Sequence, residues 1–327
     1  MKKTILTAVS VAALLATATT LAPVAQAKDK LLIGATSASS SQYGYFVALS
    51  QLINSKVPTV ETAVVETGAT VDNLRRIERK QIDMGLVTTN VGYQSYAGEG
   101  AFEGKKVDNR LLFVYSTAPQ NVIVRNDSGV TTLAGLAGKR FNPGLKGSAT
   151  EKTAEAVFKA LGISADYVRG STTDIVDAMK DNRVIGTVKS GAGMKLDGSS
   201  LDIATFTPIR VLGLDAAQKK TVAEKFPDLS VVDVPAGAAD GIPAYSTWSF
   251  GLAVHARTDL PEETAYQIAK AVFEDKSVQV GALSSLKGLD LMKLTVENGT
   301  IPLHPGAARY LKEKSIAIPA KLMPKGS

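Results

Sequence analysis

The chain has no cysteine and only two histidines among its 327 residues. The lack of cysteine excludes disulfides, thiolate metal sites, a cysteine nucleophile and lipid attachment through a thioether. Two histidines leave almost no basis for a multi-histidine metal site, so we expect no metal and no cofactor. Aromatic residues are only 6% of the chain and the 37 Lys and Arg residues are scattered. The sequence therefore indicates no nucleic-acid partner.

What is present is the composition of an ordinary globular protein. Apolar residues make up 45% of the chain and charged residues 21%, which is typical of a chain that folds around a hydrophobic core. The formal net charge of +6 is small for this length. The length itself predicts about two domains.

The first 27 residues have the three parts of a secretory signal peptide. Two lysines at positions 2 and 3 precede an uncharged apolar run from Ile5 to Leu21, and Ala25-Gln26-Ala27 is a small-x-small cleavage site. A membrane anchor is the alternative, but a cleavage site follows a weakly apolar Ala/Thr-rich core. Cleavage after Ala27 removes two lysines and no acid, which lowers the charge from +6 to +4. We therefore expect a protein exported to the periplasm.

The rest of the chain alternates short apolar runs with segments of helical spacing. Strands are predicted at 30–34, 62–66, 84–87, 111–115, 122–125, 139–142, 167–169, 184–189, 208–212 and 247–255. Helices are predicted at 42–54, 71–80, 90–96, 150–161, 172–180, 216–226, 261–273, 278–286, 289–298 and 305–314. This alternation is typical of an α/β fold with a largely parallel sheet.

Two long strands, near 111–126 and 247–256, enclose a second α/β unit. This pattern predicts one domain inserted into another, with a cleft between the two and the strand crossings as hinges. We divide the chain into the signal peptide (1–27), a first lobe in two parts (28–120 and 246–327) and an inserted second lobe (121–245).

Catalytic motifs are absent: the chain has no H-E-x-x-H, G-x-S-x-G or Walker A pattern. His255 lies on an apolar strand and His304 opens a helix, positions that favour packing or capping over catalysis. An exported esterase remains the alternative function, with one of Ser39, Ser40, Ser41 or Ser148 as nucleophile and one of these histidines as base. A surface adhesin is a third possibility. We expect the protein not to be an enzyme.

Polar loops follow four of the predicted strands, where ligands bind in open α/β sheets. The loop at 142–151 is rich in glycine and leads into a helix N-terminus, which suits a carboxylate or phosphate. Each loop alone could be a capped turn, but four at equivalent positions favour a shared anion cleft. The candidate ligand-binding residues are Thr36, Ser37, Ser40, Ser41, Tyr43, Thr88, Asn90, Lys146, Gly147, Ser148, Thr150, Lys189, Ser190 and Trp248.

Several segments resemble the TAXI-type extracytoplasmic solute receptors that serve TRAP transporters. Residues 83–98 resemble the family segment D-L-G-F-V-x-x-D-V-A-Y-x-A-Y-x-G. Residues 124–129, 133–140 and 147–151 resemble the family's second-domain start, and 257–261 and 301–310 resemble its C-terminal region. The resemblance implies a type II periplasmic-binding-protein fold, a monomeric receptor for a small organic acid such as glutamate or 2-oxoglutarate, and the membrane subunits of an ion-driven TRAP transporter as partner.

Three departures from the family pattern fall in the expected pocket. The first loop, T-G-G-T-G-G-T-Y-Y-P in the family, is A-T-S-A-S-S-S-Q-Y-G at 35–44, and Asn90 and Lys189 replace an acidic and an apolar residue. If both side chains face the cleft, a ligand ammonium group loses a partner and meets repulsion. The charge change predicts a di- or keto-carboxylate ahead of an amino acid such as glutamate. Alternatively, the Lys189 ammonium reaches solvent at the rim.

Overall fold

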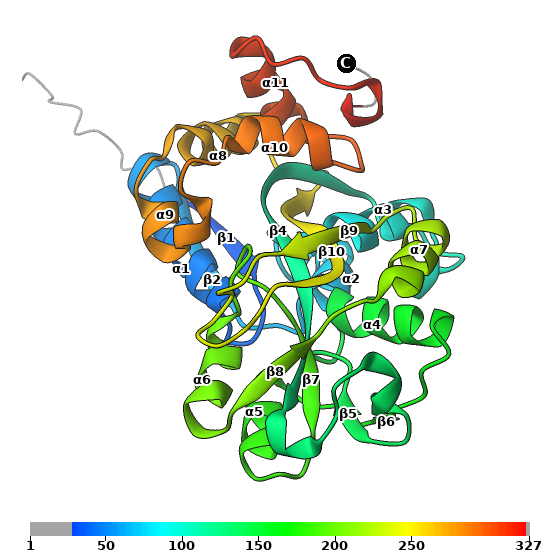
Figure 1. The fold of residues 1–327 in the computed structure, drawn as a ribbon. Helices are drawn as coiled ribbons and strands as arrows, with labels where there is room; N and C mark the ends of the chain where they lie inside the picture. The colour runs from blue at the N-terminus through cyan, green and yellow to red at the C-terminus, as the bar shows by residue number, and fades with distance from the viewer. Residues whose placement is uncertain (1–27, 325–327) are drawn as a thin grey trace, which may run out of the picture.

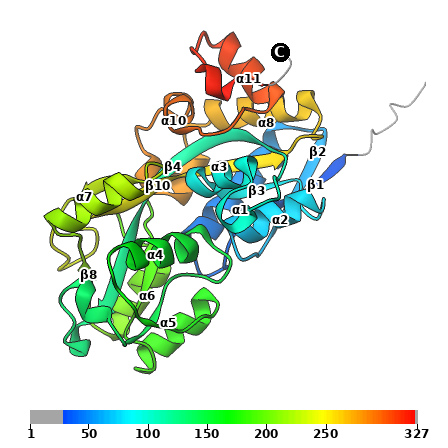
Figure 2. The ribbon, with the colours of Figure 1, turned by 90° about the vertical axis from the view of Figure 1, so that its right-hand side faces the viewer.

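The computed structural model describes residues 28–324. The predicted signal peptide, residues 1–27, lies outside the described residues. No helix in the described part is long and apolar enough to cross a membrane. The chain forms two α/β lobes that share two long strands (Figures 1 and 2).

The first lobe begins with three parallel strands, in the order β2-β1-β3. The strands are β1 (Asp29–Gly34), β2 (Val60–Val65) and β3 (Met84–Thr88). The helices that follow them are α1 (Ser41–Lys56), α2 (Thr70–Glu78) and α3 (Thr89–Ala97). Parallel pairing brings the carboxyl ends of β1 and β3 to the same edge of the sheet. The loops that follow these strands therefore open toward the second lobe.

Strands β4 (Asn109–Arg125) and β10 (Tyr245–Arg257) connect the lobes. Residues 109–119 of β4 pair with β10, whereas residues 120–125 pair with strands of the second lobe. We predicted separate strands at 111–115 and 122–125 within a long stretch near 111–126, and the structure shows one continuous strand. Pro119 has no N–H group to donate, yet its carbonyl accepts a bond of 2.8 Å from the Gly191 N–H. The hydrogen-bond ladder of β4 therefore continues past Pro119.

The second lobe contains three parallel strands, β5 (Arg140–Asn142), β6 (Asp166–Tyr167) and β7 (Gly186–Ser190). Strand β8 (Ile209–Leu212) pairs with β4, and β9 (Ser230–Val234) pairs with β10. Four helices surround them: α4 (Ala149–Ala160), α5 (Thr172–Lys180), α6 (Gly198–Phe206) and α7 (Ala216–Lys225). Neither α6 nor β9 was predicted from the sequence.

The chain returns to the first lobe for its last helices. They are α8 (Glu262–Glu274), α9 (Val278–Ala282), α10 (Leu291–Asn298) and α11 (Pro305–Glu313). Helices α8, α10 and α11 are drawn at the top of Figure 1 and α9 beside α1. Short 3₁₀ turns occupy 100–102, 126–128, 133–136, 284–286 and 320–322. Helix α11 packs on α8 through Gly306, where an added Cβ would lie 2.2 Å from the Glu262 carbonyl oxygen. Glycine is therefore required for this close approach.

Candidate functional site

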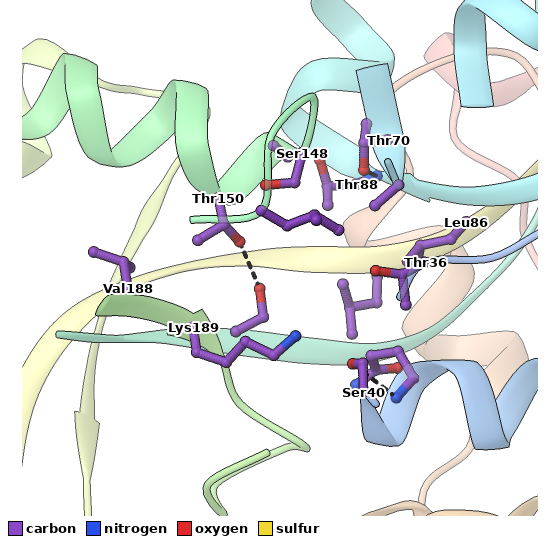
Figure 3. Close-up of a pocket in the computed structure, with 15 residues that line it drawn as sticks. Thr36, Ser40, Thr70, Leu86, Thr88, Ser148, Thr150, Val188 and Lys189 are labelled. Carbon is purple, nitrogen blue, oxygen red and sulfur yellow. Dashed lines mark hydrogen bonds between the residues drawn. The ribbon is translucent and has the colours of Figure 1, made fainter. Parts of the chain in front are cut away.

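A cavity of about 40 Å³ lies where the two lobes meet (Figure 3). One ordered water needs roughly 10–15 Å³, so only a small molecule fits without further separation of the lobes. Both lobes line the cavity, with hydroxyl, amide and aliphatic side chains and one charged group. The lining residues are Thr36, Ser40, Gln42, Ala69, Thr70, Leu86, Thr88, Leu145, Ser148, Ala149, Thr150, Val188, Lys189, Ser190 and Leu252.

The first lobe contributes hydroxyl groups from the ends of β1 and β3 and from the start of α2. Thr36 follows β1, Ser40 caps α1 and Thr88 ends β3. The Thr88 hydroxyl is buried and has no hydrogen-bond partner among the described residues. A buried, unpaired hydroxyl is costly, and this one belongs to a residue that lines the cavity. The Thr70 hydroxyl accepts the Thr88 N–H at 3.2 Å and so fixes the end of β3.

The second lobe contributes the N-terminus of α4. Ser148 is the N-cap residue, and its hydroxyl oxygen accepts the Glu151 N–H at 3.1 Å. The first N–H groups of a helix lack intrahelical partners and favour negative charge. The Thr150 hydroxyl donates to the Gln120 side-chain oxygen at 2.9 Å and lies 2.9 Å from the Ser190 hydroxyl. The Thr150 hydroxyl is thus engaged with Gln120 and Ser190, whereas the Ser148 hydroxyl oxygen accepts the Glu151 N–H.

Among the described residues, Lys189 is the only charged one that lines the cavity. It lies on β7, and Figure 3 shows its ammonium group extending toward Thr36 and Ser40. Its Nζ lies 3.6 Å from the Oδ1 of Asp197, a fully buried carboxylate behind the cavity wall. Asp197 was not among the residues predicted from the sequence. The local signal was the run Asp197-Gly-Ser-Ser, because an aspartate that caps a helix is a common N-terminal signature.

Half of the predicted ligand-binding residues line the cavity: Thr36, Ser40, Thr88, Ser148, Thr150, Lys189 and Ser190. Four others lie close by without lining it, namely Ser37, Ser41, Lys146 and Gly147. Ser41 and Gly147 instead join the lobes. The Ser41 hydroxyl accepts the Gly198 N–H at 2.8 Å, and the Gly147 carbonyl accepts the Val71 N–H at 3.0 Å.

The remaining three candidates do not line the cavity. Tyr43 is half-buried on α1. Asn90 donates to the Thr153 hydroxyl at 3.2 Å and lines a separate groove between α3 and α4. Trp248 is fully buried on β10, with its ring edge-on to Phe158. The charge changes at Asn90 and Lys189 therefore do not act in one cavity.

Neither of the two histidines lines the cavity. His255 is buried in the first lobe, and its Nδ1 lies 2.6 Å from the Asn109 side-chain oxygen. His304 caps α11 by accepting the Gly306 N–H. Burial lowers the pKa of His255 to about 3 and that of His304 to about 4. No cavity serine therefore has a histidine base beside it, and the described residues hold no cluster of metal-ligating side chains.

Comparisons with known proteins agree with this architecture. A family model described as "NMT1-like family" matches residues 33–315. A periplasmic transporter structure is 11% identical, with a TM-score of 0.53 over 88% of this chain and 93% of that one. An ancestral arginine-binding protein bound to arginine is 15% identical, with a TM-score of 0.51 over 80% and 99%. A putative L-cystine ABC transporter from Listeria monocytogenes is 11% identical, with a TM-score of 0.51 over 80% and 99%. At these identities the likeness establishes the two-lobed binding-protein fold.

Proposed function

Because the chain belongs to the NMT1-like family, we propose that it is a periplasmic solute-binding protein that captures a small organic acid and delivers it to a membrane transporter. The supporting observation is the cavity between the lobes, with hydroxyl donors from both lobes and the single cation Lys189. A carboxylate there meets the α4 N-terminus, the Ser148 hydroxyl and the Lys189 ammonium. Such groups favour an anion.

We propose a TRAP-type transporter as the partner, on the strength of the TAXI-like segments at 83–98 and 301–310. The solved structures with similar folds include a putative ABC transporter protein. TRAP transporters use an ion gradient and ABC importers use ATP, so the energy source of uptake distinguishes the two kinds of transporter. Uptake of the bound acid that stops when the ion gradient is dissipated at constant ATP supports the TRAP assignment. Uptake that stops only when ATP is depleted assigns the protein to an ABC importer.

Solute binding requires the lobes to open and close. We propose that 28–120 and 246–327 move as one body and 121–245 as the other, bending near 115–121 in β4 and 245–248 in β10. Hydrogen bonds join the lobes, among them Ser40–Asp197 at 3.0 Å beside the cavity and Gln94–Asp228 at 3.1 Å in the groove between α3 and α4. A solute that touches both lobes adds to contacts that exist only in the closed state, and so favours closure.

The test is binding and closure on the mature protein. Mass spectrometry identifies what co-purifies, and calorimetric titration then measures small organic acids against neutral sugars. Small-angle scattering at saturation should give a smaller radius of gyration. Binding of a sugar but of no acid, or an unchanged radius with a saturating acid, contradicts the proposal.

A further inference from the structure

We propose that Asp197 restricts the cavity to solutes that carry a single carboxylate. This inference rests on the proposed function, since it specifies the anion that the same cavity takes. Among the described residues, Lys189 is the one cation at the cavity wall. That cation is already shared with a protein carboxylate, at 3.6 Å.

Asp197 is held in place by donors from both lobes. Its Oδ2 accepts the Ser40 hydroxyl at 3.0 Å and the Ser41 N–H at 2.9 Å, both from the first lobe. Its Oδ1 accepts the Ser199 N–H at 3.1 Å and the Ser199 hydroxyl at 2.6 Å, at the start of α6. Every partner is a donor, as an ionised carboxylate requires. The carboxylate is fully buried and cannot turn away to solvent.

Lys189 and Asp197 together are neutral, so the pair offers no net positive charge to a solute. One solute carboxylate is still accommodated, because the lysine ammonium, the α4 N-terminus and the Ser148 hydroxyl all favour it. A second carboxylate finds no further cation among the lining residues. A buried charge without a partner is strongly disfavoured.

The remaining lining groups fit a small solute with an aliphatic or hydroxylated body. Leu86, Leu145, Val188 and Leu252 supply apolar wall, and the threonine and serine hydroxyls supply neutral hydrogen-bonding groups. The cavity volume of about 40 Å³ also favours a solute with one carboxylate, since a second carboxylate adds both charge and size. The structure therefore favours a short monocarboxylate over the dicarboxylates that the sequence resemblance implies.

Calorimetric titration of the mature protein with pairs of equal carbon number tests this inference. Butyrate is compared with succinate, and 2-oxovalerate with 2-oxoglutarate, so that each pair differs by one charge and little in length. We expect each monocarboxylate to bind at least about tenfold more tightly than its dicarboxylate partner. Asp197→Asn removes the negative charge and should reduce the ratio of monocarboxylate to dicarboxylate affinity by about tenfold, because two charges a few ångströms apart interact strongly in a protein interior. Asp202→Asn, which removes an exposed carboxylate from the same helix, should leave the ratio unchanged.

The outcomes separate the two proposals. A dicarboxylate that binds the wild-type protein as tightly as its monocarboxylate partner overturns the charge inference and leaves the solute-binding function standing. This comparison needs no variant, so it decides the question even if Asp197→Asn does not fold. An unchanged ratio in a folded Asp197→Asn protein removes Asp197 as the cause. If no acid of either class binds, the proposed function itself fails.

Discussion

Ser148 illustrates how one side chain serves both the fold and the candidate site. Its hydroxyl oxygen caps α4 by accepting the Glu151 N–H, while the same group lines the cavity. Thr150, two residues later, has its hydroxyl engaged with Gln120 and Ser190. The two residues that the sequence places together as anion donors therefore differ in how freely they can donate.

Replacing Ser148 should weaken solute binding more than replacing Thr150. A hydrogen bond to a charged group is worth roughly 1.5–3 kcal/mol, so Ser148→Ala should reduce affinity for a bound carboxylate by about tenfold or more in calorimetric titration. Loss of the cap should also cost about 1 kcal/mol of stability. Ser171→Ala is the matched control, because Ser171 caps α5 and does not line the cavity. The control should lose stability and keep its affinity; wild-type affinity in Ser148→Ala would refute this placement of the carboxylate.

At the scale of elements, the contact between α8 and α11 depends on the absence of a side chain. Gly306 lies in the first turn of α11, against the backbone of α8. A Cβ at this position would lie 2.2 Å from the Glu262 carbonyl oxygen and 2.5 Å from the Tyr266 nitrogen. Both atoms belong to helix backbone, so neither can move away cheaply.

Gly306→Ala should therefore destabilise the protein by about 1–3 kcal/mol, the usual cost of overpacking a tight contact. Urea-induced unfolding measures the effect. Gly281→Ala is the control, because Gly281 also lies in a C-terminal helix but has nothing within 4 Å of an added Cβ. That variant should be neutral or slightly stabilising, since alanine is the better helix former. Equal stability of the two variants would show that α11 shifts to relieve the contact.

At the scale of the whole molecule, the two buried histidines make stability depend on pH. Burial lowers the pKa of His255 to about 3 and that of His304 to about 4, whereas the unfolded chain has values near 6.5. The folded protein therefore binds fewer protons than the unfolded chain between about pH 4 and pH 6.5. Stability is complete above this range and falls as the pH falls through it.

We expect the free energy of unfolding to drop by about 4 kcal/mol between pH 7 and pH 5, with about 2 kcal/mol from each histidine. Urea unfolding at pH 7, 6 and 5 measures this change, in a window above most carboxyl titrations. His255→Gln should remove about half of the drop. A wild-type stability that is flat across the window would mean that both imidazoles titrate in the folded protein as they do in the unfolded chain.

The sequence by itself determined the α/β class, the alternation of elements, the two long crossing strands and the loops that hold half of the proposed ligand contacts. These features follow from short-range patterns: apolar periodicity defines strands and helices, and polar residues after a strand mark the edge where ligands bind. The match of the family model to residues 33–315 and the solved structures agree with that fold.

Only the tertiary structure decided which polar residues share a cavity. Asp197 meets Ser40 across a separation of 157 positions, and no local pattern at either residue encodes the pairing. Asn90 lies two residues after Thr88 yet points into a different groove, because α3 turns its side chain away from the end of β3. Trp248 was predicted from the sequence to contact the ligand, but its side chain is buried in the core beside Phe158. The net charge of a site is the sum over all residues that the fold brings together. From the sequence, Lys189 was expected to be an unpaired cation, whereas in the structure it forms an ion pair with Asp197.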